Sequence, residues 1–139
     1  MVKELLTFTL QDLSIIDSLM HELSASSHCD ENLLNNALKD PNVHVYVIRE
    51  EGLICATGTL CIKHTLEFSS ADIESVVVSS NHRGRGYGKE LMAAMIDSAK
   101  SLKVHHIQLT SNPKRETANR LYQDLGFEKY ETNCYKMVL

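Results

Sequence analysis

The apolar residues of the chain recur with two periods, and these predict helices and strands. A period of three to four residues is typical of one face of a helix, and alternation of apolar with polar residues is typical of a strand. The helical period predicts four helices, over residues 13–23, 33–38, 86–102 and 113–125. Alternating or short apolar runs predict seven strands, over residues 5–10, 43–48, 53–63, 73–78, 104–110, 127–130 and 134–138.

Residues with special backbone preferences mark the ends of these elements. Asp12 and Asn112, the latter before a proline, are expected to cap helix starts, and Gly126 is expected to end the last helix. Glu51-Gly52 predicts a hairpin turn, and Gly58 predicts a bulge or a close approach within its strand. The order becomes β-α-α-β-β-β-α-β-α-β-β, which predicts an α/β protein with a mixed sheet and flanking helices.

Length and composition fit one globular domain over residues 1–139. The chain is 43% hydrophobic and 23% charged, as in ordinary soluble proteins. A net charge of −4 disfavours a nucleic-acid-binding surface. No apolar run reaches the ~18 residues that a membrane span needs. Four scattered cysteines without closely spaced histidines predict no metal site. We therefore expect a cytoplasmic protein with no metal and with neither nucleic acid nor membrane as partner.

The most informative segment is a glycine-rich turn between a strand and a helix. The apolar strand 73–78 leads into Arg83-Gly84-Arg85-Gly86-Tyr87-Gly88-Lys89, where the next helix begins. The unpaired N–H groups and the dipole of a helix N-terminus favour an anion. Three glycines let the backbone approach that anion closely, and Arg83, Arg85 and Lys89 add positive charge. The segment predicts a pyrophosphate-binding loop.

Spacing excludes two other phosphate-binding motifs. A P-loop needs Ser or Thr after its lysine, but Glu90 follows Lys89. A dinucleotide-binding fingerprint needs Gly-x-Gly-x-x-Gly and an acidic residue at the end of the next strand. Here the glycines are spaced Gly84-x-Gly86-x-Gly88, and the next strand ends at Thr110 without an acidic residue.

The loop and a second motif together resemble the GNAT superfamily of N-acetyltransferases. The family's coenzyme signature, [Gln/Arg]-x-x-Gly-x-[Gly/Ala], is matched by Arg83-x-x-Gly86-x-Gly88, and a downstream pattern is matched by Asn119-Arg120-Leu121-Tyr122 and Gly126-Phe127. The resemblance implies a mostly antiparallel central sheet with flanking helices. It also implies acetyl-CoA as the co-substrate and an amine as the acceptor.

The resemblance further implies roles for individual residues. Val76 and Val78 would bind the pantetheine arm through their backbone, and Asn119 would contact the coenzyme near its thiol end. The backbone amides of the loop would bind the pyrophosphate; these belong to Arg83, Gly84, Arg85, Gly86, Tyr87 and Gly88. The N–H of Val76 would stabilise the oxyanion, and Tyr122 would protonate the leaving thiolate.

Glu74 is the candidate catalytic base, because it is a carboxylate on an otherwise apolar strand. Burial would favour its neutral form and bring its pKa nearer the range useful for taking a proton from the amine. The alternative is a strand residue that faces solvent or pairs with a surface cation. For Tyr122 the alternative is a core aromatic on the apolar stripe of its helix.

These observations predict an enzyme that transfers acetyl from acetyl-CoA directly to a primary amine of a small molecule, such as a polyamine, an aminosugar or an amino acid. Two alternatives stay open: a protein or peptide N-acetyltransferase, and a non-catalytic coenzyme-binding regulatory module. Residues 24–36 would build the acceptor site, where Asp30 and Glu31 could attract a cationic amine. A homodimer through the last strand, around Tyr135, is a further expectation from similar proteins.

Overall fold

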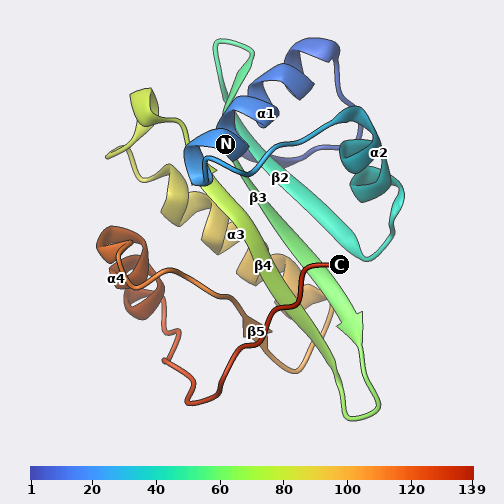
Figure 1. Ribbon diagram of the computed structural model, residues 1–139, viewed down its shortest axis with the longest axis vertical. Coiled ribbons are helices and arrows are strands. Elements are labelled where there is room, and N and C mark those ends of the chain that lie inside the picture. Colours follow the sequence, from blue (N-terminus) through green and yellow to red (C-terminus); the bar gives the residue numbers. More distant parts are fainter. The chain divides into compact units, whose positions relative to one another are not determined.

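The computed structural model describes residues 1–139, and the chain forms two compact units, Met1–Leu109 and Thr110–Leu139. The first unit contains a five-stranded sheet in the order β1-β2-β3-β4-β5 (Figure 1). Its strands are β1 (Val2–Glu4), β2 (Val43–Glu50), β3 (Leu53–His64), β4 (Ser69–Val78) and β5 (Ile107–Gln108). All neighbours are antiparallel except β4 and β5, which are parallel. The predicted mixed, mostly antiparallel sheet is confirmed; the single domain stays a prediction.

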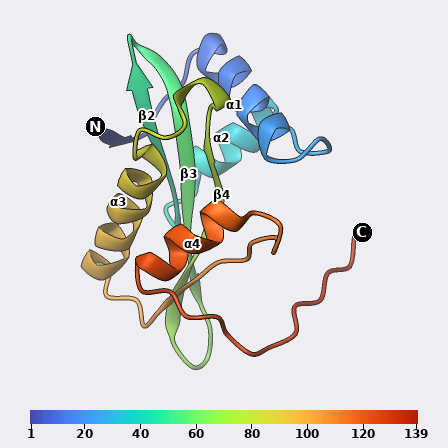
Figure 2. The ribbon, with the colours of Figure 1, turned by 90° about the vertical axis from the view of Figure 1, so that its left-hand side faces the viewer.

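The helices of the first unit lie on both faces of this sheet. Helices α1 (Leu10–Leu23) and α2 (Glu31–Lys39) cover one face, and α3 (Tyr87–Ser101) covers the other (Figure 2). A short 3-10 helix, η1 (Ser80–His82), connects β4 to the loop before α3. The three helices predicted for this part of the chain are therefore present. The coenzyme-loop candidate lies between the carboxyl end of β4 and the amino end of α3.

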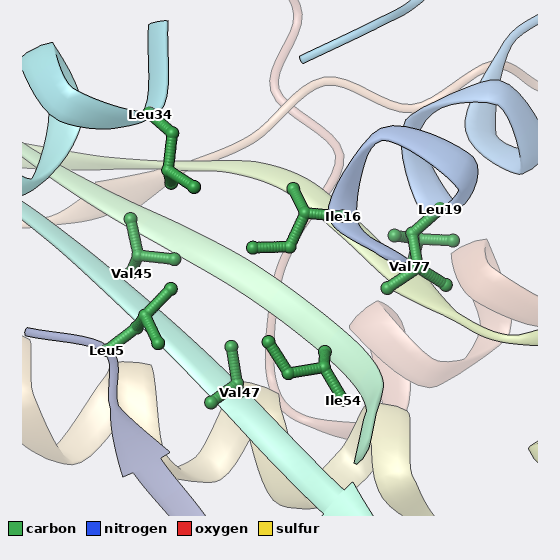
Figure 3. Close-up of a cluster of buried hydrophobic side chains, with 8 residues drawn as sticks. All are labelled: Leu5, Ile16, Leu19, Leu34, Val45, Val47, Ile54 and Val77. Atoms are coloured by element: carbon green, nitrogen blue, oxygen red, sulfur yellow. The ribbon is translucent and has the colours of Figure 1, made fainter. Parts of the chain in front are cut away.

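The core between the sheet and the first two helices is apolar (Figure 3). Ile16 and Leu19 of α1 and Leu34 of α2 lie over strand residues that include Val45 and Val77. Each of these side chains is at most 6% exposed. On the opposite face, Leu91, Met92 and Met95 of α3 are fully buried. Removing this much apolar surface from water is what holds the two layers of helices on the sheet.

The first turn of α1 differs from the prediction. Thr9, rather than Asp12, is the N-cap: its hydroxyl accepts from the N–H of Asp12 at 3.1 Å, and the Asp12 carboxylate accepts from the N–H of Thr9 at 3.1 Å. This reciprocal pair is a capping box. The predicted strand 5–10 was wrong: the first strand is Val2–Glu4, and Leu10 already belongs to α1.

Strand β5 is shorter than the predicted strand 104–110. The N–H of Val104 still bonds to the carbonyl of Ala99 at the end of α3, at 3.4 Å. The parallel register with β4 covers only Ile107 and Gln108. The backbone turn after α3 therefore uses residues that the apolar pattern had assigned to the strand.

The second unit contains α4 (Glu116–Asp124). Asn112 does not cap this helix: its side chain accepts from the N–H of Lys114 at 2.9 Å and closes a turn, and the helix begins later. Gly126 follows the helix at φ 99°, as expected for a residue that ends a helix. Residues 127–139 form no strand, so the two predicted final strands were wrong. A strand needs a hydrogen-bonded neighbour, and the backbone bonds here are local, from Phe127 to Tyr122 and from Thr132 to Tyr130.

Candidate active site

A β-bulge interrupts β4 near its carboxyl end. Thr59 of β3 pairs with Glu74 and Thr57 pairs with Val77, so Ser75 and Val76 both lie opposite Gly58. Ser75 adopts φ 53°, which a residue with a side chain rarely does. The extra residue of a bulge leaves the regular ladder and bends its strand. Gly58 predicted the position of the bulge, but nothing in the sequence indicated that the extra residue belongs to β4.

The loop after β4 has the backbone of an anion-binding site. Gly84 and Gly86 are left-handed, at φ 77° and 83°, a conformation that side chains disfavour. Gly86 is the N-cap of α3 and has no side chain to cap it. The first N–H groups of α3 therefore have no partner within the helix. This geometry suits a ligand with negatively charged oxygens.

The two arginines of this loop already form ion pairs with carboxylates. Arg85 Nη1 donates to both carboxylate oxygens of Glu50, each at 3.0 Å. Arg83 Nε donates to the carbonyl of Val78 at 3.1 Å, and its Nη2 lies 3.8 Å from Glu22 Oε1. Sequence reasoning missed Glu22 and Glu50, because each lies far from the loop in the chain. The side-chain charge of the loop is thus partly offset before any ligand binds, and the backbone amides are left as its main anion donors.

Glu50 is the meeting point of three side chains, one from the loop and one from the helix on each side of it. In addition to Arg85, the hydroxyl of Tyr87 donates to Glu50 Oε1, and His82 Nε2 lies 3.1 Å from Glu50 Oε2. The hydrogen bond from Tyr87, with those from Arg85 and the charge of His82, holds the pKa of Glu50 below its usual value. The same hydrogen bond raises the pKa of Tyr87. Glu50 is therefore the ionised acceptor in this cluster.

Glu74 lies next to the bulge and its side chain is exposed. Partial desolvation raises the pKa of Glu74, the charge of Asp72 raises it further, and the charge of Lys63 opposes both. Lys63 Nζ itself pairs with Asp72 Oδ2 at 3.3 Å. Both earlier interpretations of Glu74 therefore keep some support: it faces solvent, and its pKa is shifted toward that of a base.

An acidic environment extends from Glu74 along the sheet. Burial raises the pKa of the Cys61 thiol, and the charges of Glu74, Asp72 and Asp40 raise it further. Cys61 pairs with Asp72 in the β3–β4 register. The three carboxylates therefore act electrostatically on one place, where Lys63 already supplies one positive charge through its ion pair with Asp72.

The family model of the acetyltransferase (GNAT) family matches residues 10–127, which include the bulged strand, the loop and α3. The chain belongs to the acetyltransferase (GNAT) family. The prediction of a GNAT acetyltransferase, made from the loop and the downstream motif, is confirmed.

One curated relative with a similar sequence is itself named as an N-acetyltransferase. The aminoalkylphosphonate N-acetyltransferase of Salmonella typhimurium (strain LT2) is 27% identical over 117 residues, covering 83% of this chain and 75% of that protein. A protein of Mycobacterium leprae is 31% identical over 88 residues, or 63% of this chain, and these span only 23% of its own length.

Two solved structures are similar over nearly the whole chain. A transcriptional regulator from Bacillus halodurans C-125 has a TM-score of 0.85 and 26% identity, covering 100% of this chain and 99% of that one. An aminoglycoside N-acetyltransferase in complex with CoA has a TM-score of 0.76 and 16% identity, covering 99% and 98%. The latter shows the shared fold alone.

Asn119 and Tyr122, the downstream motif residues with predicted roles, lie in the second unit. The side-chain amide of Asn119 donates to the carbonyl of Asn112 at 2.9 Å, which ties α4 to the turn before it. The ring of Tyr122 meets that of Phe127 edge to face, with centroids 6.2 Å apart. The packing interpretation of Tyr122 thus has a definite partner, while the coenzyme role of Asn119 and the acid role of Tyr122 stay predictions.

No group of three or more His, Cys, Asp or Glu side chains is arranged to hold a metal ion. None of the helices has the length and apolar character that crossing a membrane would need.

Proposed function

We propose that this GNAT protein transfers acetyl from acetyl-CoA directly to a primary amine of a small molecule. The observation that carries the proposal is the loop at residues 83–88, with two left-handed glycines, an N-terminus of α3 without a side-chain cap, and a bulged strand leading into it. These features fit a pyrophosphate followed by a thioester arm. The family, in which acetyl-CoA is the donor, supports the same conclusion.

Different residues of the chain would bind the different parts of acetyl-CoA. The amides of the loop and Lys89 bind the pyrophosphate, and the backbone of Val76 and Val78 binds the pantetheine arm. Asn119 holds the coenzyme near its thiol. As the amine nitrogen forms its bond to the thioester carbonyl carbon, the N–H of Val76 stabilises the negative charge on the carbonyl oxygen. The C–S bond then breaks, and the sulfur leaves as a thiolate.

Two side chains would move protons in this reaction. Only the neutral amine can attack, and Glu74, directly or through a water, takes the proton that the amine must lose. Its raised pKa supports this role, because a base works best with a pKa closer to the working pH. Tyr122 donates a proton to the departing thiolate, and the nitrogen, positively charged after its bond to carbon forms, loses a second proton that restores the Tyr122 hydroxyl. No side chain is acylated, so acetyl passes directly from sulfur to nitrogen.

The acceptor is proposed to be a small cationic amine. The acidic set of Asp40, Asp72 and Glu74 around Cys61 would favour a positively charged molecule near the base. The similarity to an aminoalkylphosphonate N-acetyltransferase supports a primary amine on a small molecule as the acceptor. Protein or peptide amines remain a second candidate acceptor.

A non-catalytic regulatory module is the second candidate function. It is favoured by one specific observation, the similarity in fold to a protein described as a transcriptional regulator. Such a module would bind the coenzyme without turnover. The expected homodimer, around Tyr135, and the cytoplasmic location stay predictions under either function.

The test combines a thermal-shift titration with CoA and a thiol-release assay with acetyl-CoA. The acceptor panel contains polyamines, aminosugar phosphates, aminoalkylphosphonates, amino acids and peptides. Stabilisation by CoA together with turnover of one small-amine class would support the proposal. Turnover of peptides alone would favour the second acceptor class, and stabilisation without any turnover would favour the regulatory module. If neither CoA nor acetyl-CoA stabilises the folded protein, the proposed function is wrong.

A further inference from the structure

One carboxylate of the β2–β3 hairpin contacts three side chains, one from the coenzyme-loop candidate and one from each of its two ends. We propose that Glu50 is a positioning residue that holds the loop from His82 to Tyr87 in the shape that binds the pyrophosphate of the coenzyme. This inference rests on the proposed coenzyme-binding function and adds a residue that no sequence motif contains.

The three contacts are spread over the whole loop. His82 stands at its beginning, Arg85 in its middle, and Tyr87 at the first turn of α3. Both left-handed glycines, Gly84 and Gly86, lie between these anchors. Glycines give an unanchored loop many conformations. Contacts to Glu50 on both sides of each glycine therefore restrict the loop before the ligand binds. Without these contacts, ordering the loop would cost part of the binding free energy.

Glu50 can act in this way because its own position is fixed. It pairs with Leu53 at the end of the hairpin. The turn itself is held by Arg49, whose Nη1 donates to the carbonyl of Gly52 at 3.0 Å. The guanidinium of Arg49 also binds both carboxylate oxygens of Asp12 of α1, at 2.8 and 3.0 Å. The carboxylate of Glu50 thus lies at a turn that hydrogen bonds hold in place.

The expected consequence concerns binding rather than chemistry. Ordering a flexible segment on binding lowers affinity, and ordering it beforehand restores that affinity. Glu50 should therefore raise the affinity for ligands that contain a pyrophosphate and leave the later acyl transfer unchanged. The opposite hypothesis is that Glu50, as an anion, competes with the pyrophosphate for Arg85. It predicts that removing the charge of Glu50 tightens binding.

The test compares Glu50→Gln with Glu51→Gln, its neighbour in the same turn, which makes no side-chain hydrogen bond or ion pair. Calorimetry gives the Kd for CoA, and steady-state kinetics give kcat and KM for two donors, acetyl-CoA and S-acetylpantetheine. The second donor has the thioester arm but no pyrophosphate. The change of side chain is small, and the melting temperature of each free variant shows whether it is folded.

For Glu50→Gln we expect the Kd for CoA and the KM for acetyl-CoA to rise about tenfold, with kcat nearly unchanged, as for the loss of a charge-assisted hydrogen-bond set. The kcat/KM for S-acetylpantetheine should stay at the wild-type value, and Glu51→Gln should behave as wild type. Tyr87→Phe removes one of the three contacts but keeps the backbone amides, and should give a smaller rise in Kd.

Three results would overturn the inference. These are an unchanged Kd, a tighter Kd, or an equal loss of activity with both donors, which would indicate general damage to the fold. If the wild-type protein itself fails to bind CoA, the proposed function fails first. If only the Glu50 inference is wrong, wild type will bind CoA and Glu50→Gln will bind it with a Kd that is no higher.

Discussion

Gly58 of β3 lies against the end of the Met95 side chain of α3, so closely that a Cβ at position 58 would stand 2.9 Å from Met95 Cε and 3.4 Å from Val76 Cγ2. Val76 belongs to the bulge of β4. The absence of a side chain at Gly58 therefore lets α3 approach the sheet just where the bulge lies. The sequence predicted a bulge or a close approach at this glycine, and the structure has both.

Gly58→Ala should lower the free energy of unfolding by about 1–2 kcal/mol, as is usual when a methyl group is forced into a packed core. Met95 is fully buried, so its terminal methyl would have to shift within the packed core to make room for the new methyl group. Urea denaturation measures the change. In a Met95→Leu background, which has no atom at the ε position, Gly58→Ala should cost less. Equal costs in both backgrounds would show that Met95 is not the cause.

The ion pair between Asp12 and Arg49 should make stability depend on pH in the acid range. The Asp12 side chain is only 8% exposed, and the hydrogen bond from Arg49 lowers the pKa of Asp12 below its ordinary 3.8, although desolvation opposes this shift. A carboxylate with a lowered folded-state pKa stabilises the fold above its unfolded-state pKa. That stability is lost as the pH falls through the folded-state value.

Asp12→Asn should therefore lower the free energy of unfolding by about 1–3 kcal/mol at neutral pH, since it removes a charged partner from a buried hydrogen-bonded group. Below pH 3.8 the difference from wild type should shrink. Urea denaturation at about pH 7 and about pH 2.5 gives the comparison. Arg49→Lys should lose part of the same stability, because lysine cannot bind both carboxylate oxygens in the same plane. A difference that does not change with pH would contradict this account.

Local signals in the sequence predicted most of the fold. The alternation in β2 and β3 and the apolar stripes of α1 and α3 depend on burial against the nearest layer, which is visible within a short window. The two final strands failed because a strand depends on a partner elsewhere in the chain. Their alternating residues, such as Tyr135 and Met137, are exposed. A short window contains no information on whether that partner is present.

The sequence predicted the backbone of the candidate site but not the contacts between side chains that lie far apart in the chain. The glycines of the loop predicted a close approach of the backbone to an anion, and two of them, Gly84 and Gly86, adopt the left-handed conformations that side chains disfavour. Glu22 and Glu50 could not be found in this way. Their pairing with Arg83 and Arg85 depends on where α1 and the β2–β3 hairpin end in space.

Glu74, if it is the base, should control the acid limb of the pH–rate profile. A base is active when deprotonated, so kcat/KM should fall as the pH drops through its pKa, which lies above the ordinary 4.5. Glu74→Gln should lower kcat by about 10²-fold or more and remove this limb. Glu67→Gln, an exposed carboxylate in the β3–β4 turn, serves as the matched control.

The neighbours of Glu74 should move this limb in opposite directions. Asp72 raises the pKa of Glu74, so Asp72→Asn should shift the limb to lower pH. Lys63 lowers the pKa of Glu74, so Lys63→Gln should shift the limb to higher pH. The measurement is kcat/KM across the acid range for each variant. A limb that stays in place in both variants would assign it to another group, such as the amine acceptor.

Tyr122→Phe separates the acid role of this residue from its packing role. Phenylalanine keeps the ring that meets Phe127 edge to face, so the free energy of unfolding should change by no more than about 1 kcal/mol. If the hydroxyl protonates the departing thiolate, kcat should fall by about 10²-fold, with little change in the KM for acetyl-CoA. Phe127→Leu should show the reverse pattern, because it weakens the ring contact and keeps the hydroxyl. Full activity in Tyr122→Phe would leave Tyr122 with a packing role alone, and solvent would then be the proton donor to the thiolate.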